Sequence, residues 1–149
     1  MEFVSGEPDS VLKKLRSPLG DTSGFDEVWI VVDEDGHDRT TLLAACAKLC
    51  GKNQQWFAVI SRPCFEVWLI GHYTNVRNYM DQGQAQKHFR ELIPKNVPTK
   101  QLPQDFPYDL AEQAIVQSHL ANSSLADLDK LPPSPGTAMP HLVRALKIC

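Results

Sequence analysis

Two short apolar runs, separated by an amphipathic stretch, give the first half of the chain its pattern. Residues 27–32 and 55–61 are rich in β-branched and aromatic side chains, which is typical of strands buried within a sheet. Between them, residues 39–50 repeat apolar positions at helical spacing, with Asp38 as the expected N-cap and Gly51 as the expected C-cap. A strand, a helix and a second strand in this order predict a right-handed parallel crossover.

Helical periodicity dominates the rest of the chain. It predicts helices at residues 11–16, 64–72, 81–92, 109–121 and 138–147. Proline-rich segments predict a loop at residues 94–107 and a rigid connector at residues 132–136. Residues 3–5 provide at most a marginal third strand, so the predicted sheet is small for a parallel one. Either a partner supplies an edge strand, or the chain begins inside a larger fold.

We therefore predict one α/β domain over residues 1–149, with a small, mostly parallel sheet flanked by helices. Residues 1–75 form its α/β part, and residues 76–149 form a helical C-terminal half. A chain of 149 residues is large enough for a single sizeable core. Apolar residues make up 42% and charged residues 22%, which is an ordinary balance for a globular domain.

Charge and hydropathy exclude some classes of function. A formal net charge of -3 argues against a generally basic nucleic-acid-binding surface, although a bound cation and a few lysines would still hold phosphates. No apolar run approaches the ~18 residues that a membrane span needs, and the first residues lack the pattern of a signal peptide. The 4 cysteines show neither disulfide nor zinc spacing, so we expect reduced core thiols and a cytoplasmic protein without membrane contact.

Acidic side chains follow the first predicted strand directly. The segment reads Asp33, Glu34, Asp35, Gly36, His37 and Asp38. If the strand continues through Asp33 and Asp35, their carboxylates project from the same face, and a hard divalent cation would relieve their repulsion. The alternative is a solvated acidic turn in which Asp38 caps the next helix. His37 also has two interpretations, since it suits either a general base or phosphate contact or an exposed turn histidine.

Two segments of the chain resemble RloB-like proteins. Residues 25–35 (Phe-Asp-Glu-Val-Trp-Ile-Val-Val-Asp-Glu-Asp) resemble that family's strand and Asp-x-Asp. Residues 61–73 (Ser-Arg-Pro-Cys-Phe-Glu-Val-Trp-Leu-Ile-Gly-His-Tyr) resemble its Ser-x-Pro-Cys-Phe-Glu-x-Trp-Leu-x-x-His segment. Residues 135–137 and 141–143 are similar to its last helix, though less specifically. The resemblance covers residues 25–73 well and the tail loosely.

The resemblance implies a Toprim-like fold, which is a metal-binding α/β domain, and a place beside ATPases in bacterial restriction, phage-defence or abortive-infection loci. Carried over by position, Asp33 and Asp35 would be metal-binding carboxylates for Mg²⁺ or Mn²⁺. Glu66 and His72 occupy the family's Phe-Glu and His positions, whose roles are less settled.

One part of the family pattern is missing. Toprim domains have a first strand that ends in glutamate, and RloB-like proteins show a Glu-Gly-x-x-Thr-Glu segment there. Glu2 and Glu7 do not follow an apolar strand, so we expect a shortened homologue that lacks this strand. Glu66 could be the third acid instead, because it follows the strand beside the Asp33 strand, and both would lie at the carboxyl edge of the sheet. Alternatively, Glu66 forms a structural ion pair with Arg62.

Two functions follow from these expectations. The first is a Mg²⁺- or Mn²⁺-dependent, nuclease-like domain that acts on phosphodiesters of DNA or RNA. Asp33, Asp35 and Glu66 would hold the metal, and His37 and His72 are further catalytic candidates. The second is an inactive RloB-like module that binds a partner ATPase or forms a homodimer through an unpaired sheet edge.

Overall fold

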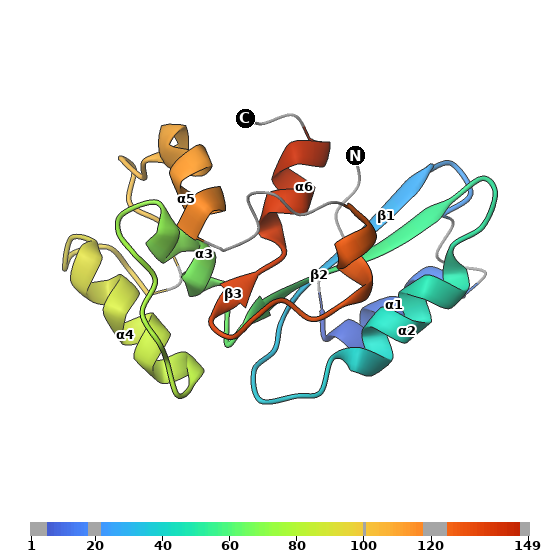
Figure 1. The fold of residues 1–149 in the computed structure, drawn as a ribbon, viewed down its shortest axis with the longest axis horizontal. Coiled ribbons are helices and arrows are strands. Elements are labelled where there is room, and N and C mark those ends of the chain that lie inside the picture. Colours follow the sequence, from blue (N-terminus) through green and yellow to red (C-terminus); the bar gives the residue numbers. More distant parts are fainter. Residues whose placement is uncertain (1–5, 18–21, 100, 118–124, 147–149) are drawn as a thin grey trace.

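A three-stranded sheet organises the part of the chain that the structure describes. The computed structural model describes residues 6–17, 22–99, 101–117 and 125–146. The strand order is β1-β2-β3, and Figure 1 shows the strands running through the middle of the molecule. The marginal strand expected at residues 3–5 lies outside the described residues.

The long strands β1 (Glu27–Asp33) and β2 (Gln55–Arg62) are parallel, as predicted. Their register runs from Glu27 opposite Gln55 to Asp33 opposite Ser61. The carboxyl ends of both strands therefore lie next to each other, and we call this end of the sheet its carboxyl edge. The helix between them, α2 (Thr40–Leu49), buries one face against the sheet. The strand–helix–strand crossover predicted from the apolar pattern is therefore confirmed.

The third strand, β3, was not predicted. Gly136–Thr137 pairs antiparallel with the end of β2, with Thr137 opposite Ser61, so the sheet is mixed and the helical half contributes a strand. The Ser61 and Thr137 hydroxyls form a buried hydrogen bond of 2.7 Å. Gly136 passes so close to Pro133 that a Cβ atom would lie 2.5 Å from the Pro133 carbonyl oxygen. Long-range contacts define this two-residue strand, and local periodicity does not reveal such contacts.

The other helices are arranged around both faces and the carboxyl end of the sheet (Figure 1). The remaining α-helices are α1 (Pro8–Arg16), α3 (Glu66–Gly71), α4 (Gln82–Leu92), α5 (Ala111–Gln117) and α6 (Met139–Ala145). Two 3₁₀ helices, η1 (Tyr108–Leu110) and η2 (Leu125–Asp129), precede α5 and β3. The predicted α-helices are all present, but α1 begins earlier than predicted, several others are shorter, and η2 was not predicted. Residues 118–121 of the predicted fifth helix lie outside the described part of the chain.

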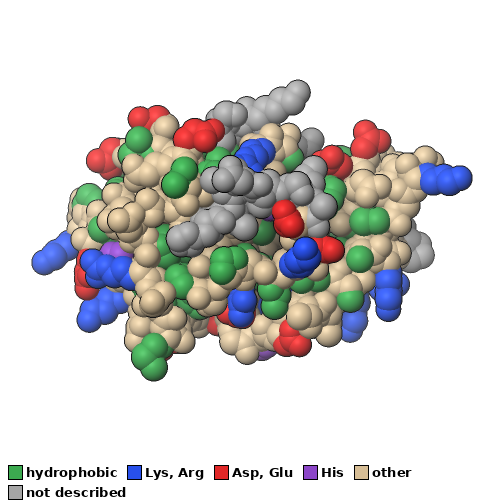
Figure 2. All heavy atoms as spheres, in the orientation of Figure 1, with side chains coloured by type: hydrophobic (Ala, Val, Ile, Leu, Met, Phe, Trp, Pro, Cys, Tyr) green, Lys and Arg blue, Asp and Glu red, His purple; other side chains and the backbone are tan. Residues whose placement is uncertain are grey.

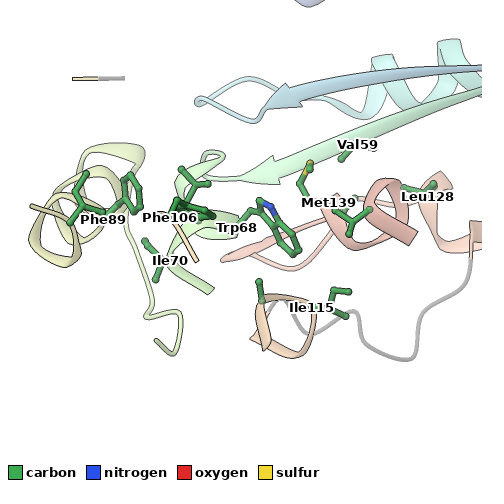
Figure 3. Packing of buried hydrophobic residues seen from close by; sticks show 13 residues of the cluster. Val59, Trp68, Ile70, Phe89, Phe106, Ile115, Leu128 and Met139 are labelled. Carbon is green, nitrogen blue, oxygen red and sulfur yellow. The ribbon is translucent and has the colours of Figure 1, made fainter. Parts of the chain in front are cut away.

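Two apolar clusters cover the two faces of β2, because successive side chains of a strand alternate between faces. Trp56, Ala58 and Ile60 pack with α1 and α2 on one side. Val59 packs on the other side, in a cluster that also contains Met139 of α6 and residues of the helical half (Figure 3). The sheet is therefore sandwiched between helices.

Helix α3 connects this core to the carboxyl edge of the sheet. All of its residues after Glu66, from Val67 to Gly71, are buried, as its apolar sequence predicted. Gly71 allows α5 to approach closely, because a Cβ atom there would lie 3.1 Å from the Ala114 Cα. Within the described residues, no helix is both long and apolar enough to cross a membrane.

Candidate functional site

The acidic residues after β1 form a tight turn. The turn (residues 34–37) closes with a hydrogen bond of 2.9 Å from the His37 backbone N–H to the Glu34 carbonyl. Asp35 and Gly36 both have positive φ, at 47° and 70°. These features define a type I′ turn, for which Asp-Gly is a favoured pair. The strand ends at Asp33, so Asp33 and Asp35 do not share a strand face as the spacing suggested.

Asp33 lies at the end of β1 close to Glu66, the first residue of α3. Burial and, next in size, repulsion from Glu66 raise the pKa of the Asp33 carboxyl from 3.8 to about 6. A hydrogen bond from the Phe65 backbone N–H and the charge of Arg39 lower the pKa, whereas Asp35 raises it. The fold therefore brings Asp33, Glu66 and, at longer range, Asp35 to one edge. We refer to Asp33 and Glu66 as the paired carboxylates.

Backbone hydrogen bonds hold the turn against the segment that leads into α3. The Glu34 N–H donates to the Ser61 carbonyl at 2.8 Å, and the Asp35 N–H donates to the Pro63 carbonyl at 3.1 Å. These bonds extend the β1–β2 pairing beyond the strands. Since α3 begins only a few residues later, they place Glu66 beside the end of β1.

Arg62 connects the acidic turn to the C-terminal part of the chain through hydrogen bonds. Its Nε donates to Glu34 at 2.8 Å, and its Nη1 donates to the Pro132 carbonyl at 2.8 Å. The side chains of Arg62 and Glu34 are only 24% and 22% exposed. The alternative in which Arg62 pairs with Glu66 is therefore wrong, because the ionic partner of Arg62 is Glu34.

The two candidate histidines lie in different surroundings. His37 is exposed in the acidic turn, four residues after Asp33. His72 is only 3% exposed, its Nδ1 lies 3.0 Å from the Trp68 carbonyl oxygen, and its ring packs against Trp68 and Phe106. Burial lowers the pKa of His72. The structure thus places His72 in the core of the helical half and does not bring it to Asp33.

Three of the cysteines, Cys46, Cys50 and Cys64, lie in the described part of the chain, and none forms a disulfide there. Cys46 and Cys64 are buried, whereas Cys50 is exposed and not on the apolar face as expected. Within the described residues, no three His, Cys, Asp or Glu side chains gather closely enough to hold a metal ion. The paired carboxylates nevertheless suit Mg²⁺, which keeps several waters and takes one or two carboxylates from a protein.

Fold and site together define a small α/β domain that carries two neighbouring carboxylates at the carboxyl edge of a parallel strand pair. The chain belongs to the RloB-like protein family, whose model matches residues 3–146. No curated protein and no solved structure gives a significant match to the chain.

Sequence reasoning missed the groups that support the paired carboxylates. The Phe65 backbone N–H contacts Asp33 and lowers its pKa, and Arg62 holds the acidic turn through Glu34. The only signal in the sequence was their position between β2 and Glu66. Spacing cannot show which of these neighbours face the site.

The raised pKa of Asp33 predicts a pH-dependent stability. The folded state binds the Asp33 proton more tightly than the unfolded state, so this residue destabilises the fold increasingly as the pH rises from about 4 to above 6. At pH 8, Asp33→Asn should raise the free energy of unfolding by about 1–2 kcal/mol, after allowance for solvent screening. At pH 4 the gain should vanish. Urea unfolding at both pH values measures this.

Asp38→Asn serves as the control for this experiment. Hydrogen bonds from Thr40 lower the pKa of the exposed Asp38 carboxyl, so its charged form is favoured in the folded state. Asp38→Asn should therefore show no gain at pH 8. A gain equal to that of Asp33→Asn would contradict the assignment of the repulsion to Asp33.

The Arg62 contacts predict a stability loss. Arg62→Met leaves the Glu34 carboxylate and the Pro132 carbonyl without this donor, and should lower the free energy of unfolding by about 1–3 kcal/mol. The matched control is Lys130→Met, because Lys130 meets Asp127 at 3.8 Å with side chains 72% and 44% exposed. That control should change stability by less than about 1 kcal/mol. Equal losses in denaturant titrations would refute the structural role of Arg62.

Proposed function

We propose that this domain is a divalent-metal-dependent, nuclease-like domain that cleaves phosphodiesters of DNA or RNA. The observation that supports the proposal is the proximity of Asp33 and Glu66, whose repulsion contributes to the raised pKa of Asp33. A hard cation between the two carboxylates would relieve this repulsion. Ligands of parallel sheets also usually bind beyond the carboxyl ends of the strands, where this pair lies.

Asp33 and Glu66 would hold the cation, with Asp35 as a further carboxylate nearby. A bound Mg²⁺ or Mn²⁺ supplies Lewis acidity toward a phosphate and lowers the pKa of a bound water. The chain itself would orient Asp33 through the Phe65 N–H and offer the exposed His37 to a phosphate or a proton. His72 has no part in this proposal, because it is enclosed in the core.

The charge distribution agrees with phosphate binding through a cation. Figure 2 shows acidic and basic side chains interspersed on one face of the molecule, and the described surface there is not uniformly basic. The net charge of the chain is -3. Nucleic acid would therefore be held mainly at the metal and less by a broad basic surface. For this member of the RloB-like family we also propose a role in bacterial phage defence in the cytoplasm, beside a partner ATPase.

Cleavage assays test the proposal directly. The protein is incubated with single- and double-stranded DNA and with RNA in Mg²⁺ or Mn²⁺. Asp33→Asn and Glu66→Gln should each slow cleavage at least about 100-fold, since loss of a metal ligand removes several kcal/mol of stabilisation. Asp38→Asn, which changes a nearby acid that contacts only Thr40, should stay within a few-fold. Cleavage that survives Asp33→Asn combined with Asp35→Asn would exclude these residues from the reaction.

A second candidate function rests on the outer edge of β1. In the described part of the chain, β1 pairs only with β2, and Val31 on this strand is 47% exposed. Unpaired strand edges accept strands from other chains. This edge supports a non-catalytic module that binds a partner ATPase or a second copy of itself.

Light scattering coupled to size-exclusion chromatography separates the two functions. A self-associating module should run as a dimer, and Val31→Lys should convert it to a monomer, because a charge on this strand opposes strand addition. The control, Val116→Lys, changes an apolar residue on α5 that is also exposed, at 60%. A monomer at all concentrations that cleaves nucleic acid in Mg²⁺ would count against the module.

A further inference from the structure

Arg39 is anchored at the outer side of the end of β1. Its Nε donates a hydrogen bond of 2.9 Å to the Asp33 carbonyl. In the same trans peptide unit, the Glu34 N–H points the opposite way and donates to the Ser61 carbonyl of β2 at 2.8 Å. The Asp33 carbonyl therefore faces away from β2, toward the outer edge of β1. Arg39 flanks Asp33 on this side, whereas Glu66 follows β2 on the other side.

The rest of the Arg39 guanidinium is not engaged. In the part of the chain that the structure describes, neither of its Nη groups donates a hydrogen bond, and it forms no salt bridge with Asp33 or Glu66. The side chain is half-buried, and the bond from Nε limits its movement. A guanidinium held through Nε presents its two Nη groups as a planar fork, which suits anions such as phosphate.

The charges at the carboxyl edge explain why a phosphate would need this arginine. Asp33, Asp35 and Glu66 form no salt bridge with any described residue. A divalent cation would compensate only two of their three negative charges. Arg39 supplies a further positive charge, which acts on the Asp33 carboxyl and lowers its pKa. With the cation and Arg39 both present, a phosphodiester anion would approach a site that is no longer negative.

We propose that Arg39 binds the substrate phosphate beside the metal site through its two Nη groups. The inference rests on the proposed function, in which Asp33 and Glu66 hold a cation. One non-bridging phosphate oxygen would contact the cation, and the other would accept hydrogen bonds from the Nη fork. The structural alternative is that Arg39 only completes the hydrogen bonding at the end of β1.

Two substitutions separate phosphate binding from the structural role. In Arg39→Gln, the amide nitrogen stands as many bonds from the backbone as the arginine Nε, so it keeps a donor for the Asp33 carbonyl but lacks the fork and the charge. Arg39→Met removes both functions. Lys48→Gln is the matched control, because it removes the same charge from an exposed residue near the other end of α2.

Three measurements on the full chain apply to each variant. Fluorescence anisotropy with labelled single-stranded DNA and RNA oligonucleotides in Ca²⁺ measures binding. Cleavage of the same oligonucleotides in Mn²⁺ gives kcat/KM, and urea unfolding gives the stability.

Arg39→Gln should weaken oligonucleotide binding at least about tenfold and lower kcat/KM to a similar extent, because charge-assisted hydrogen bonds to phosphate are lost. Its urea midpoint should remain that of the unchanged protein, whereas Arg39→Met should lose both binding and stability. Lys48→Gln should stay within about twofold in binding. Unchanged affinity in Arg39→Gln, with a loss of stability in Arg39→Met, would overturn the proposal and leave Arg39 a structural role alone.

The same measurements distinguish this inference from the proposed nuclease function. Oligonucleotide binding that depends on Arg39 without any cleavage would refute the nuclease and support the phosphate site. Cleavage that is equally fast in Arg39→Gln would support the nuclease and refute the phosphate site. An unchanged protein that binds neither oligonucleotide would overturn both.

Discussion

At the carboxyl edge of the sheet, the carboxylates of Asp33 and Glu66 repel each other, and the surrounding structure must hold them together against this repulsion. Asp33 is half-buried there and Glu66 lies close enough to repel it, so that burial and, next in size, this repulsion raise the pKa of Asp33 to about 6. Proteins avoid such pairs unless the surrounding structure holds them or a function needs them. In this chain, the register of β1 against β2 holds them. Asp33 stands opposite Ser61, and the chain needs only a few residues beyond Ser61 to reach Glu66.

Hydrogen bonds and a nearby positive charge stabilise Asp33, but they do not remove its repulsion from Glu66. The Phe65 N–H bonds to Asp33, and Arg39 donates from its Nε to the Asp33 carbonyl at 2.9 Å. Arg62 is the basic residue nearest to Glu66 in sequence, but its guanidinium donates to the Glu34 carboxylate and the Pro132 carbonyl and not to Glu66. Arg39 and Arg62 thus bond to the backbone and to Glu34, and among the described residues neither forms a salt bridge with Asp33 or Glu66.

The apolar pattern predicted the local parts of this arrangement. The strands β1 and β2, the crossover helix α2 and the buried helix α3 all follow from periodicity over a few residues. Asp33 and Glu66 followed from the expectation that acids after neighbouring parallel strands meet at one edge. This expectation depended only on the order of the elements, which the sequence shows well.

Features that depend on distant contacts were not predictable in this way. β3 exists because Thr137 meets Ser61, and these residues are 76 positions apart. The ionic partner of Arg62 is 28 positions away, so helical spacing pointed to the wrong acid. Asp-Gly at positions 35 and 36 was a local signal for a type I′ turn, and it explains why Asp35 leaves the strand. His72 looked functional by resemblance, but its apolar neighbours in the helical half enclose it.

The central claim is that Asp33 and Glu66 together form a cation site. A crystal structure of the protein soaked in Mn²⁺, with anomalous diffraction data, tests it most directly. If Asp33 and Glu66 hold a cation, the map contains one anomalous peak within coordination distance of both carboxylates, with water molecules at the remaining positions. A well-ordered edge without such a peak at saturating Mn²⁺, or a peak bound only by other residues, would contradict it.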